Sequence, residues 1–451
     1  MAIAEPLIPV AADHPGALAA ELTTIAGRSV VLVEVAGGDR RGALSEADGD
    51  VLAAAAEHAL AAGLPLLGLF SSSGADVDEG VAALHGWGRA AAALSRCSGR
   101  VPILFAATGP VLSGPALLLG LADQVVLTED AYAFVSGPRM VETYTGEAID
   151  AVELGGAGVH AAGTGLAALV VADRDEAMAA LGELLAYLPS SVDEEPPRWW
   201  TDDPVDRPTP EAGACIPASP TGGYDVRDVI AAIVDDGEHL ELRGRWAPNL
   251  VTALATIGGR PVGIVANQPV SIAGTLDIPA SQKGARFVAF CDAFGLPLLT
   301  LVDTPGFYPG KDLEWRGMIR HGAQLAFAYA RATVPRVAVV LRKSYGGAYI
   351  VMDCRTMGSD LYLAWPSAEI AVMGAKGAVE ILHRREDEAR RLELEKEYEA
   401  RFLNPYVAAD RGLVDMVIDP ADTRREVAAG LELLATKQER LVHRKHDNTP
   451  L

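Results

Sequence analysis

LRKSYGGAYI, at Leu341–Ile350, places two adjacent glycines between a run of β-forming apolar residues and a segment compatible with a helix. Glycines at such a turn let the backbone take unusual dihedral angles and approach a ligand closely. The first N–H groups of a helix have no acceptor inside the helix, so they can stabilise a developing negative charge. We therefore predict an oxyanion hole formed by the amides of Gly347 and Ala348, although a lone Gly-Gly-Ala sequence is more often an ordinary turn.

The surroundings of this turn occur twice in the sequence. GLPLLGLFSSSG at Gly63–Gly74 matches GLPLLTLVDTPG at Gly295–Gly306, an offset of 232 residues (63 to 295). Further along, an offset of 233 (101 to 334) aligns Ser113–Pro115 with Gly346–Ala348. Because chance matches do not hold one register over such a length, the chain is predicted to be a tandem duplication.

The composition limits the class of protein. At 451 residues the chain is long enough for two domains of ordinary size. Its net charge of −22 and pI near 4.8 disfavour nucleic acid as a partner. No apolar run reaches the roughly 20 residues that a membrane span needs, and the first residues lack the pattern of a signal peptide. We expect a reduced, cytoplasmic protein without a metal site, because its four cysteines are far apart: Cys97, Cys215, Cys291 and Cys354.

Strands alternate with helices in both halves, which favours an α/β fold. We expect an N-terminal domain over residues 1–188, a linker over 189–222 and a C-terminal domain over 223–451. The linker assignment rests on eight prolines from Pro189 to Pro220, which would prevent a regular helix. Docking of the adjacent tryptophans Trp199–Trp200 would order this segment.

Hydrophobic periodicity predicts matching elements in the two halves. The predicted strands are 29–35, 65–70, 101–107, 124–128, 132–135, 262–266, 298–302 and 336–341. The predicted helices are 50–62, 79–96, 225–236, 281–294, 315–331, 383–402 and 430–440. The helix over 383–402 is expected to be solvated and self-paired, with a partner-docking helix as the alternative. Its predicted ion pairs are Glu386 with Arg390, Asp387 with Arg391, and Glu397 with Arg401.

Several common catalytic motifs are absent from the sequence. It contains no GxxxxGK[ST] phosphate loop and no G-x-S-x-G elbow, and GGAGVHAAG at Gly155–Gly163 does not fit the dinucleotide-binding pattern. His321 lies on a predicted helix, where a structural role is more common than catalysis. We therefore expect the chemistry to use backbone amides, which suit carbonyl groups that become oxyanions.

Long motifs in the second half indicate a family. They include WAPNLV, GRPVGIVANQP, ARFVAFCDAFGLPLLTLVDTPGFYPG, IRHGAQLAFAYARATVPRVAVVLRKSYGGAYIVM and AWPSAEIAVMGAKGAVEIL. Together with GPALLLGLADQVVL and SGPRMVETYTGE in the first half, the chain resembles the carboxyltransferase (β) subunit of biotin-dependent acyl-CoA carboxylases, the acetyl-/propionyl-CoA carboxylase group. The resemblance implies two tandem crotonase-type domains, each a β-β-α spiral.

The resemblance also implies how the two halves share the work. The first half would hold an acyl-CoA, the second half of a neighbouring subunit would hold carboxybiotin, and the carboxyl group would move to the α-carbon of acetyl-CoA or propionyl-CoA. A separate biotin carboxylase and biotin carrier α subunit would supply it, because this chain has no Met-Lys-Met biotinylation site. The implied assembly is a homo-oligomer, from dimer to hexamer, with no metal, nucleic acid or membrane partner.

By resemblance, individual residues receive roles. The amides of Gly347 and Ala348 would hold the biotin ureido oxygen, and the amide of Gly114 would hold the acyl-CoA enolate. Ile350 would line the acyl pocket and favour a short acyl chain, with acetyl accepted. Further substrate contacts are expected from Ser113, Pro115, Gly346, Tyr349, Gly306 and Phe307.

The first half departs from the family pattern. Its turn reads GPVLSGPA, so Ser113 replaces a glycine, and Pro115, which has no N–H, aligns with Ala348. Losing one oxyanion donor typically costs about 10²–10³ in rate, which the Ser113 hydroxyl would partly offset. Asp76 stands where the family has arginine and should disfavour an anionic CoA group. The alternative function is a non-catalytic or unusual-acceptor subunit, paired with an active paralogue in a hetero-oligomer.

Overall fold

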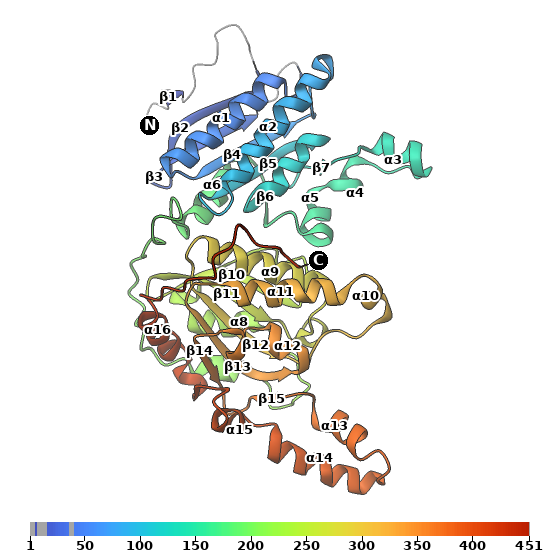
Figure 1. Cartoon of the computed structure of the whole chain (residues 1–451), viewed down its shortest axis with the longest axis vertical. Coiled ribbons are helices and arrows are strands. Elements are labelled where there is room, and N and C mark those ends of the chain that lie inside the picture. Colours follow the sequence, from blue (N-terminus) through green and yellow to red (C-terminus); the bar gives the residue numbers. More distant parts are fainter. Residues whose placement is uncertain (1–4, 7–15, 36–39, 451) are drawn as a thin grey trace. The chain divides into compact units, whose positions relative to one another are not determined.

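The computed structural model describes residues 5–6, 16–35 and 40–450. The chain divides into two compact units, Met1–Pro197 and Arg198–Leu451. Each unit contains one mostly parallel sheet with helices packed against it (Figure 1). The division lies inside the proline-rich segment 189–222.

The sheet of the first unit has the order β1-β2-β3-β4-β5-β6-β8, with β7 paired to β5. Its strands are β1 (Glu5–Pro6), β2 (Leu18–Ile25), β3 (Arg28–Val35), β4 (Leu66–Ser72), β5 (Ile103–Leu112), β6 (Gln124–Thr128), β7 (Ala133–Phe134) and β8 (Leu169–Val171). Its helices are α1 (Glu46–Ala62), η1 (Val77–Glu79), α2 (Val81–Cys97), η2 (Gly114–Leu121), α3 (Pro138–Thr145), α4 (Ala151–Gly155), α5 (Ala157–Val159), η3 (His160–Thr164) and α6 (Arg174–Ala186). Helices α1 and α2 lie side by side on one face of the sheet (Figure 1). They approach closely because Gly49 faces Gly86: a Cβ on Gly49 would lie 2.1 Å from the Gly86 carbonyl carbon.

The sheet of the second unit has the order β16-β14-β13-β12-β11-β10-β9, with β15 paired to β13. Its strands are β9 (His239–Glu241), β10 (Leu250–Ile257), β11 (Arg260–Asn267), β12 (Leu298–Thr304), β13 (Arg336–Tyr345), β14 (Leu361–Ala364), β15 (Glu369–Ala371) and β16 (Met416–Val417). Its α-helices are α7 (Pro210–Ala214), α8 (Val226–Ile233), α9 (Ile278–Ala293), α10 (Lys311–Trp315), α11 (Met318–Arg331), α12 (Gly346–Val351), α13 (Ala375–Leu382), α14 (Glu388–Phe402), α15 (Pro405–Asp410) and α16 (Thr423–Leu433). Four 3-10 helices complete the unit: η4 (Asp235–Gly237), η5 (Ile272–Gly274), η6 (Arg355–Met357) and η7 (Pro420–Asp422).

The duplication is confirmed in three dimensions. In each unit an antiparallel hairpin, β2–β3 or β10–β11, is followed by parallel strands in the same order. The two hairpin loops, Ala26–Gly27 and Gly258–Gly259, both have positive φ at both positions. That backbone is the type I′ turn, whose twist matches the twist of the strands it joins. The offset seen in the sequence is therefore a structural repeat.

Most predicted strands are present, with two recurring differences. The first strand of each hairpin, β2 and β10, is not predicted from the sequence. The strands before the two glycine-containing turns, β5 and β13, run past the predicted ends at residues 107 and 341. Near these ends the pairing of β5 with β4, and of β13 with β12, shifts register. Beyond the shift, β5 also pairs with the short strand β7 and β13 with the short strand β15, so both strands continue.

Two predicted helices are wrong at their bounds. The helix over 315–331 is divided into α10 and α11 at Gly317, which has a φ of +94°. The helix over 430–440 is α16, which begins at Thr423 and ends at Leu433.

Within the ranges that the structure describes, we find no helix with the length and hydropathy needed to cross a bilayer.

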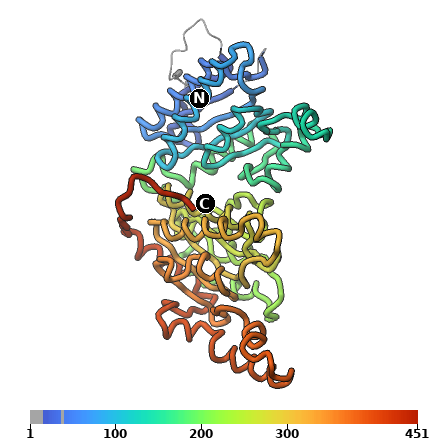
Figure 2. Tube along the Cα trace, turned by 45° about the vertical axis from the view of Figure 1, so that its right-hand side comes forward, coloured from blue at the N-terminus to red at the C-terminus, as the bar shows by residue number. Residues whose placement is uncertain are grey.

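The predicted helix over 383–402 is present as α14, but it begins at Glu388 instead of 383. Helices α13 and α14 extend beyond the sheet as an arm, drawn in orange to red in Figure 2. Asp387 caps α14 by accepting a hydrogen bond from the Arg390 amide, so the second helix begins after it. Arg390 pairs with Glu393 and Glu397 instead of Glu386.

The proline-rich segment beyond Arg198 packs within the second unit and is not a bare linker. It contains α7, so the expectation that no regular helix forms here is wrong. Pro210 occupies the first turn of this five-residue helix, where a missing N–H costs no hydrogen bond. Trp200 is 82% exposed, whereas the Trp199 amide donates to the Gly259 carbonyl at 2.7 Å, so only the first tryptophan of the pair docks.

A buried arginine holds this segment in place. Arg424 of α16 is fully buried and donates to the carbonyl oxygens of Asp203 and Pro204. It also forms an ion pair with Asp235 at 2.6 Å. The first residues of the unit are therefore tied to its last helix.

A buried lysine orders the loop that leads into β10. Lys283 of α9 donates to the carbonyl oxygens of Arg243 (2.9 Å), Trp246 (3.0 Å) and Ala247 (3.4 Å). Arg243 and Ala247 both have positive φ, so the loop depends on contacts of this kind. Burial lowers the pKa of Lys283 to about 7.

We predict that Lys283→Met lowers the free energy of unfolding by at least about 2 kcal/mol. The variant leaves three carbonyl acceptors, one buried and two partly buried, without their donor, and an unpaired buried group costs about 1–3 kcal/mol. Urea unfolding followed by circular dichroism measures the change. Lys396→Met on the exposed face of α14 is the control and should stay within about 0.5 kcal/mol of wild type. Equal stability of the two variants would contradict a structural role for Lys283.

Candidate active site

The glycine turn of the second unit has the geometry expected from the sequence. β13 ends at Tyr345 and α12 begins at Gly346, whose φ is +59°. The amides of Gly347 and Ala348 therefore lie in the first helical turn, where N–H groups have no acceptor within the helix. Ala348 is completely buried, so the backbone rather than its side chain forms this surface.

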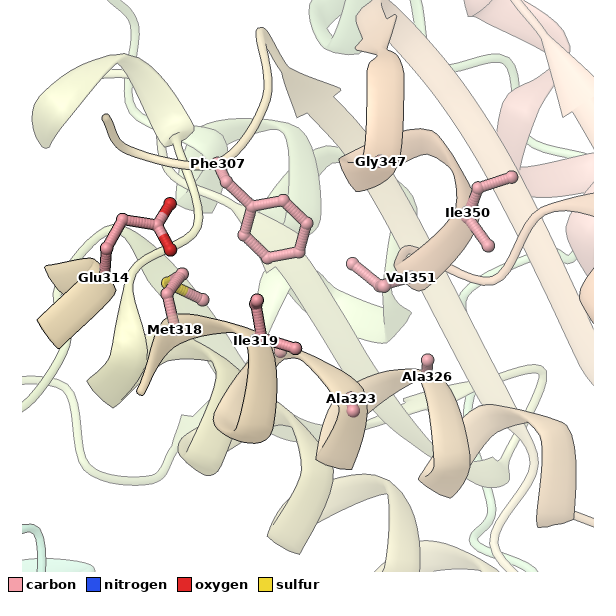
Figure 3. Close-up of a pocket in the computed structure, with 10 residues that line it drawn as sticks. Phe307, Glu314, Met318, Ile319, Ala323, Ala326, Gly347, Ile350 and Val351 are labelled. Atoms are coloured by element: carbon pink, nitrogen blue, oxygen red, sulfur yellow. The ribbon is translucent and has the colours of Figure 1, made fainter. Parts of the chain in front are cut away.

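A cavity of about 380 Å³ opens beside this turn (Figure 3). Helix α11 forms one wall of the cavity, and α12 and the loop after β12 contribute to the others. The lining residues are Phe307, Glu314, Met318, Ile319, Gly322, Ala323, Ala326, Gly347, Ile350 and Val351. The lining is apolar apart from Glu314, and its size is that of a small-ligand pocket.

Phe307 joins this cavity to the glycine turn. Gly306, with a φ of +138°, turns the chain after β12, and Phe307 then forms a bridge with Leu276. In Figure 3 the Phe307 ring lies between the turn and α11. A Cβ on Gly347 would lie 3.2 Å from Cε2 of this ring, so the ring can pack this close to the turn only because residue 347 has no side chain. Ile350, 40% exposed, lines the same cavity as the sequence predicts.

Tyr349 faces the interior of the protein. Its hydroxyl is buried, and its ring meets the ring of Tyr362 edge to face, with centroids 6.2 Å apart. Burial raises the pKa of Tyr349 to about 12. The sequence analysis expected this side chain to contact substrate. In the structure it packs instead beneath α12, against Tyr362.

Sequence analysis missed a buried polar cluster at the ends of β12 and β13. Asp303 accepts hydrogen bonds from Arg342 Nε (3.0 Å), the Tyr224 hydroxyl (2.9 Å) and the Lys343 amide (3.1 Å). Burial raises the pKa of Asp303, and the charge of Arg342 opposes that rise. The sequence did contain a sign of this cluster, namely a difference between the two repeats. Ser71 in the first copy aligns with Asp303 in the second.

The turn of the first unit keeps the positive φ of the second turn despite its altered sequence. Ser113 has a φ of +64°, close to that of Gly346, and its amide donates to the Phe134 carbonyl at 2.9 Å. Its hydroxyl makes no capping hydrogen bond with η2. Pro115 is buried and has no N–H to donate. Gly114 lies between these two residues and packs against the indole of Trp87.

Asp76 does not present a free negative charge. Its side chain is buried, forms an ion pair with Arg40, and caps η1 by accepting from the Asp78 amide at 3.0 Å. The expectation that Asp76 repels an anionic CoA group is corrected accordingly, because Arg40 offsets its charge.

The candidate residues thus form two groups, one in each unit. Within the first unit the turn brings together Ser113, Gly114 and Pro115. Within the second unit the turn and the β12 loop bring together Gly306, Phe307, Gly346, Gly347, Ala348 and Ile350. Among the residues that the structure describes, there is no group of three or more His, Cys, Asp or Glu side chains arranged to hold a metal ion.

Comparison with known proteins places this geometry in a family. Residues 14–449 match the family model described as the carboxyl transferase domain. The methylmalonyl-CoA carboxyltransferase 12S subunit of Propionibacterium freudenreichii subsp. shermanii is 47% identical over 400 residues, which cover 87% of this chain and 76% of that protein. The propionyl-CoA carboxylase beta chain of Saccharopolyspora erythraea is 44% identical over 429 residues, which cover 91% of this chain and 79% of that protein.

The fold comparison agrees. The crystal structure of transcarboxylase 12S, described as a hexamer assembly with methylmalonyl-coenzyme A and methylmalonic acid bound, superimposes with a TM-score of 0.94 and 45% sequence identity. The match covers 96% of this chain and 85% of that chain. The architecture is the expected α/β fold of two tandem crotonase-type domains. The chain belongs to the carboxyl transferase domain family, and it is a carboxyltransferase subunit of the biotin-dependent acyl-CoA carboxylase type.

Proposed function

We propose that this subunit moves a carboxyl group from carboxybiotin on a carrier protein to the α-carbon of propionyl-CoA or acetyl-CoA. The observation that carries the proposal is the turn at Gly346–Ala348, whose helical amides lie beside an apolar cavity of about 380 Å³. A small bicyclic ring with one carbonyl oxygen suits such a cavity, because the ring carbons contact the apolar walls and the oxygen meets the amides. The names of the similar proteins support the choice of acyl-CoA.

The two turns receive separate roles in this proposal. Biotin supplies the carboxyl group when its carrier is bound. The amides of Gly347 and Ala348 hold the ureido oxygen while negative charge develops on it, and the amide of Gly114 holds the thioester oxygen of the acyl-CoA. Backbone donors fixed by a strand and a helix need no rearrangement at the moment of reaction, so they stabilise the transition state more than the ground state.

The proposal extends to partners and location. A biotin-carrying subunit with a biotin carboxylase delivers the carboxyl group, and copies of this chain assemble as a homo-oligomer between dimer and hexamer. Trp315 (76% exposed) and Ile319 (83% exposed), close to the cavity, are apolar side chains that a second copy would cover. The four free thiols favour a reducing compartment, the cytoplasm.

Replacing Ala348 by proline tests the role of the second turn. The aligned position of the first unit already holds Pro115, so proline fits this backbone. Ala348→Pro removes one donor and should reduce kcat about 10²–10³-fold in an assay of malonyl-CoA or methylmalonyl-CoA formation from a carboxylated biotin carrier. Ala348→Gly keeps the amide and should lose less than about tenfold. A proline variant as active as the glycine variant would remove the amide from the mechanism.

Ile350 is predicted to set the acyl preference, because the α-carbon of the acyl-CoA must reach the carboxyl group of the carboxybiotin held in the cavity that Ile350 lines. Ile350→Asp places a charge on the wall of an apolar cavity and should change the ratio of the acetyl-CoA and propionyl-CoA rates by roughly tenfold or more, since one methylene is worth about 1–3 kcal/mol in a pocket. Steady-state kinetics with both acyl-CoA substrates measure this ratio. Ala326→Asp, one helix away on the same cavity, separates a specific effect of position 350 from a general effect of charge. An unchanged ratio in Ile350→Asp would exclude this assignment.

The oligomeric state is predicted to be at least a dimer. Light scattering coupled to size exclusion at micromolar concentration should give a mass of at least twice 47.2 kDa. Ile319→Asp should shift the mass toward the monomer, because a charge there must be buried at the interface. A single species at the monomer mass for wild type would refute the proposed assembly.

A further inference from the structure

A different aromatic side chain covers the glycine in each turn. In the second unit Phe307, from the loop after β12, lies 3.2 Å from the place of a Gly347 Cβ. Phe307 forms an isolated β-bridge with Leu276, and in the first unit Ala75 forms the corresponding bridge with Leu44. The first unit therefore has only the methyl group of Ala75 where the second unit has the Phe307 ring. There the ring comes from α2 instead, and a Cβ on Gly114 would lie 3.1 Å from Cζ2 and 3.4 Å from Nε1 of Trp87.

The ring in the first unit differs from phenylalanine in carrying a hydrogen-bond donor. Nε1 of Trp87 is buried and has no hydrogen-bond partner among the described residues. A buried donor without a partner costs about 1–3 kcal/mol, and most such groups in native proteins are paired. An indole N–H can only donate, so its partner must be an acceptor. The edge of the ring that bears Nε1 is the edge that packs against Gly114.

The unpaired N–H of Trp87 lies beside the first-unit turn, which lacks a backbone N–H donor at Pro115. The repeat aligns Pro115 with Ala348, and proline cannot supply the amide that Ala348 supplies. The Ser113 hydroxyl, the other candidate, is on an exposed residue and makes no capping hydrogen bond with η2. Trp87 Nε1 therefore lies beside Gly114, whose amide is the other N–H group that we assign to this turn.

We infer that the indole N–H of Trp87 replaces the amide missing at Pro115 and donates to the thioester oxygen of the acyl-CoA as that oxygen becomes negatively charged. This inference rests on the proposed function of the first turn. No covalent bond to the tryptophan forms, and the residue acts through one hydrogen bond that strengthens as charge develops. The first unit then keeps two donors in spite of its proline.

A double-mutant cycle tests this substitution of one donor for another. Trp87→Phe keeps a ring and removes the N–H, so kcat for acyl-CoA carboxylation should fall about 10²–10³-fold while the KM for acyl-CoA changes less than about threefold. Pro115→Ala alone adds an amide to a turn that already has two donors, so it should raise kcat by a smaller factor than it does in the Trp87→Phe background. In the Trp87→Phe/Pro115→Ala variant the new amide should restore kcat at least tenfold relative to Trp87→Phe. Trp200→Phe, at an exposed tryptophan, controls for loss of an indole elsewhere.

A binding measurement separates this inference from the proposed function. S-nitroethyl-CoA, whose nitronate imitates the charge of the enolate, is titrated by calorimetry into the full-length chain and its variants. Trp87→Phe should raise the Kd of this analogue at least tenfold and leave the Kd of free CoA within twofold. If wild type binds the analogue but makes no carboxylated product, the proposed function fails and the Kd values still decide the role of Trp87.

Two results would overturn the inference. One is a Trp87→Phe variant whose kcat and analogue Kd stay within twofold of wild type. The other is a loss that Pro115→Ala does not restore, which would show that the indole only packs against Gly114. Thermal unfolding of each variant identifies a folding defect, and Trp87→Tyr, with a ring and a displaced donor, then replaces Trp87→Phe in the cycle.

Discussion

One backbone conformation organises both candidate sites: the positive φ of the residue between strand and helix, Ser113 or Gly346. It stands where the strand ends, and the next amides belong to the first turn of the helix. Glycine adopts it freely, whereas serine at φ +64° and ψ −150° bears about 1–3 kcal/mol of strain. The first unit retains this angle without its glycine, so the surrounding contacts, among them the hydrogen bond from Ser113 to Phe134, must hold it there.

The two units support this shared turn by different means. In the second unit the ends of β12 and β13 are locked by the buried pair of Asp303 and Arg342. In the first unit the aligned residues are Ser71 and Gly109, which lie in contact but carry no charge. Duplication thus preserved the path of the backbone, while the side chains beneath it diverged. The altered first turn differs in its donors and leads into a 3-10 helix instead of an α-helix, but it keeps the positive φ of the second turn.

The sequence predicted those features that depend on local chemistry or on the repeat. The turn at Gly346–Ala348 could be predicted because its glycines interrupt a strand, and the second turn followed from the offset. The helix over 383–402 was predicted to begin too early, because Asp387 caps α14 and the helix therefore starts at Glu388. The inward orientation of Tyr349, the pairing of Asp76 with Arg40 and the packing of Trp87 on Gly114 depend on tertiary contacts that no local pattern encodes.

The burial of Arg424 also bears on how the chain folds during synthesis. Its partners Asp203 and Pro204 precede it by 221 and 220 residues, so they leave the ribosome long before it does. The first unit, whose strands all lie before residue 198, is complete at that stage and folds while the rest is made. The segment after Arg198 must wait in contact with solvent until α16 emerges. A premature stop before Arg424 would therefore leave Asp235 buried without its cation and release the beginning of the second unit as well as its end.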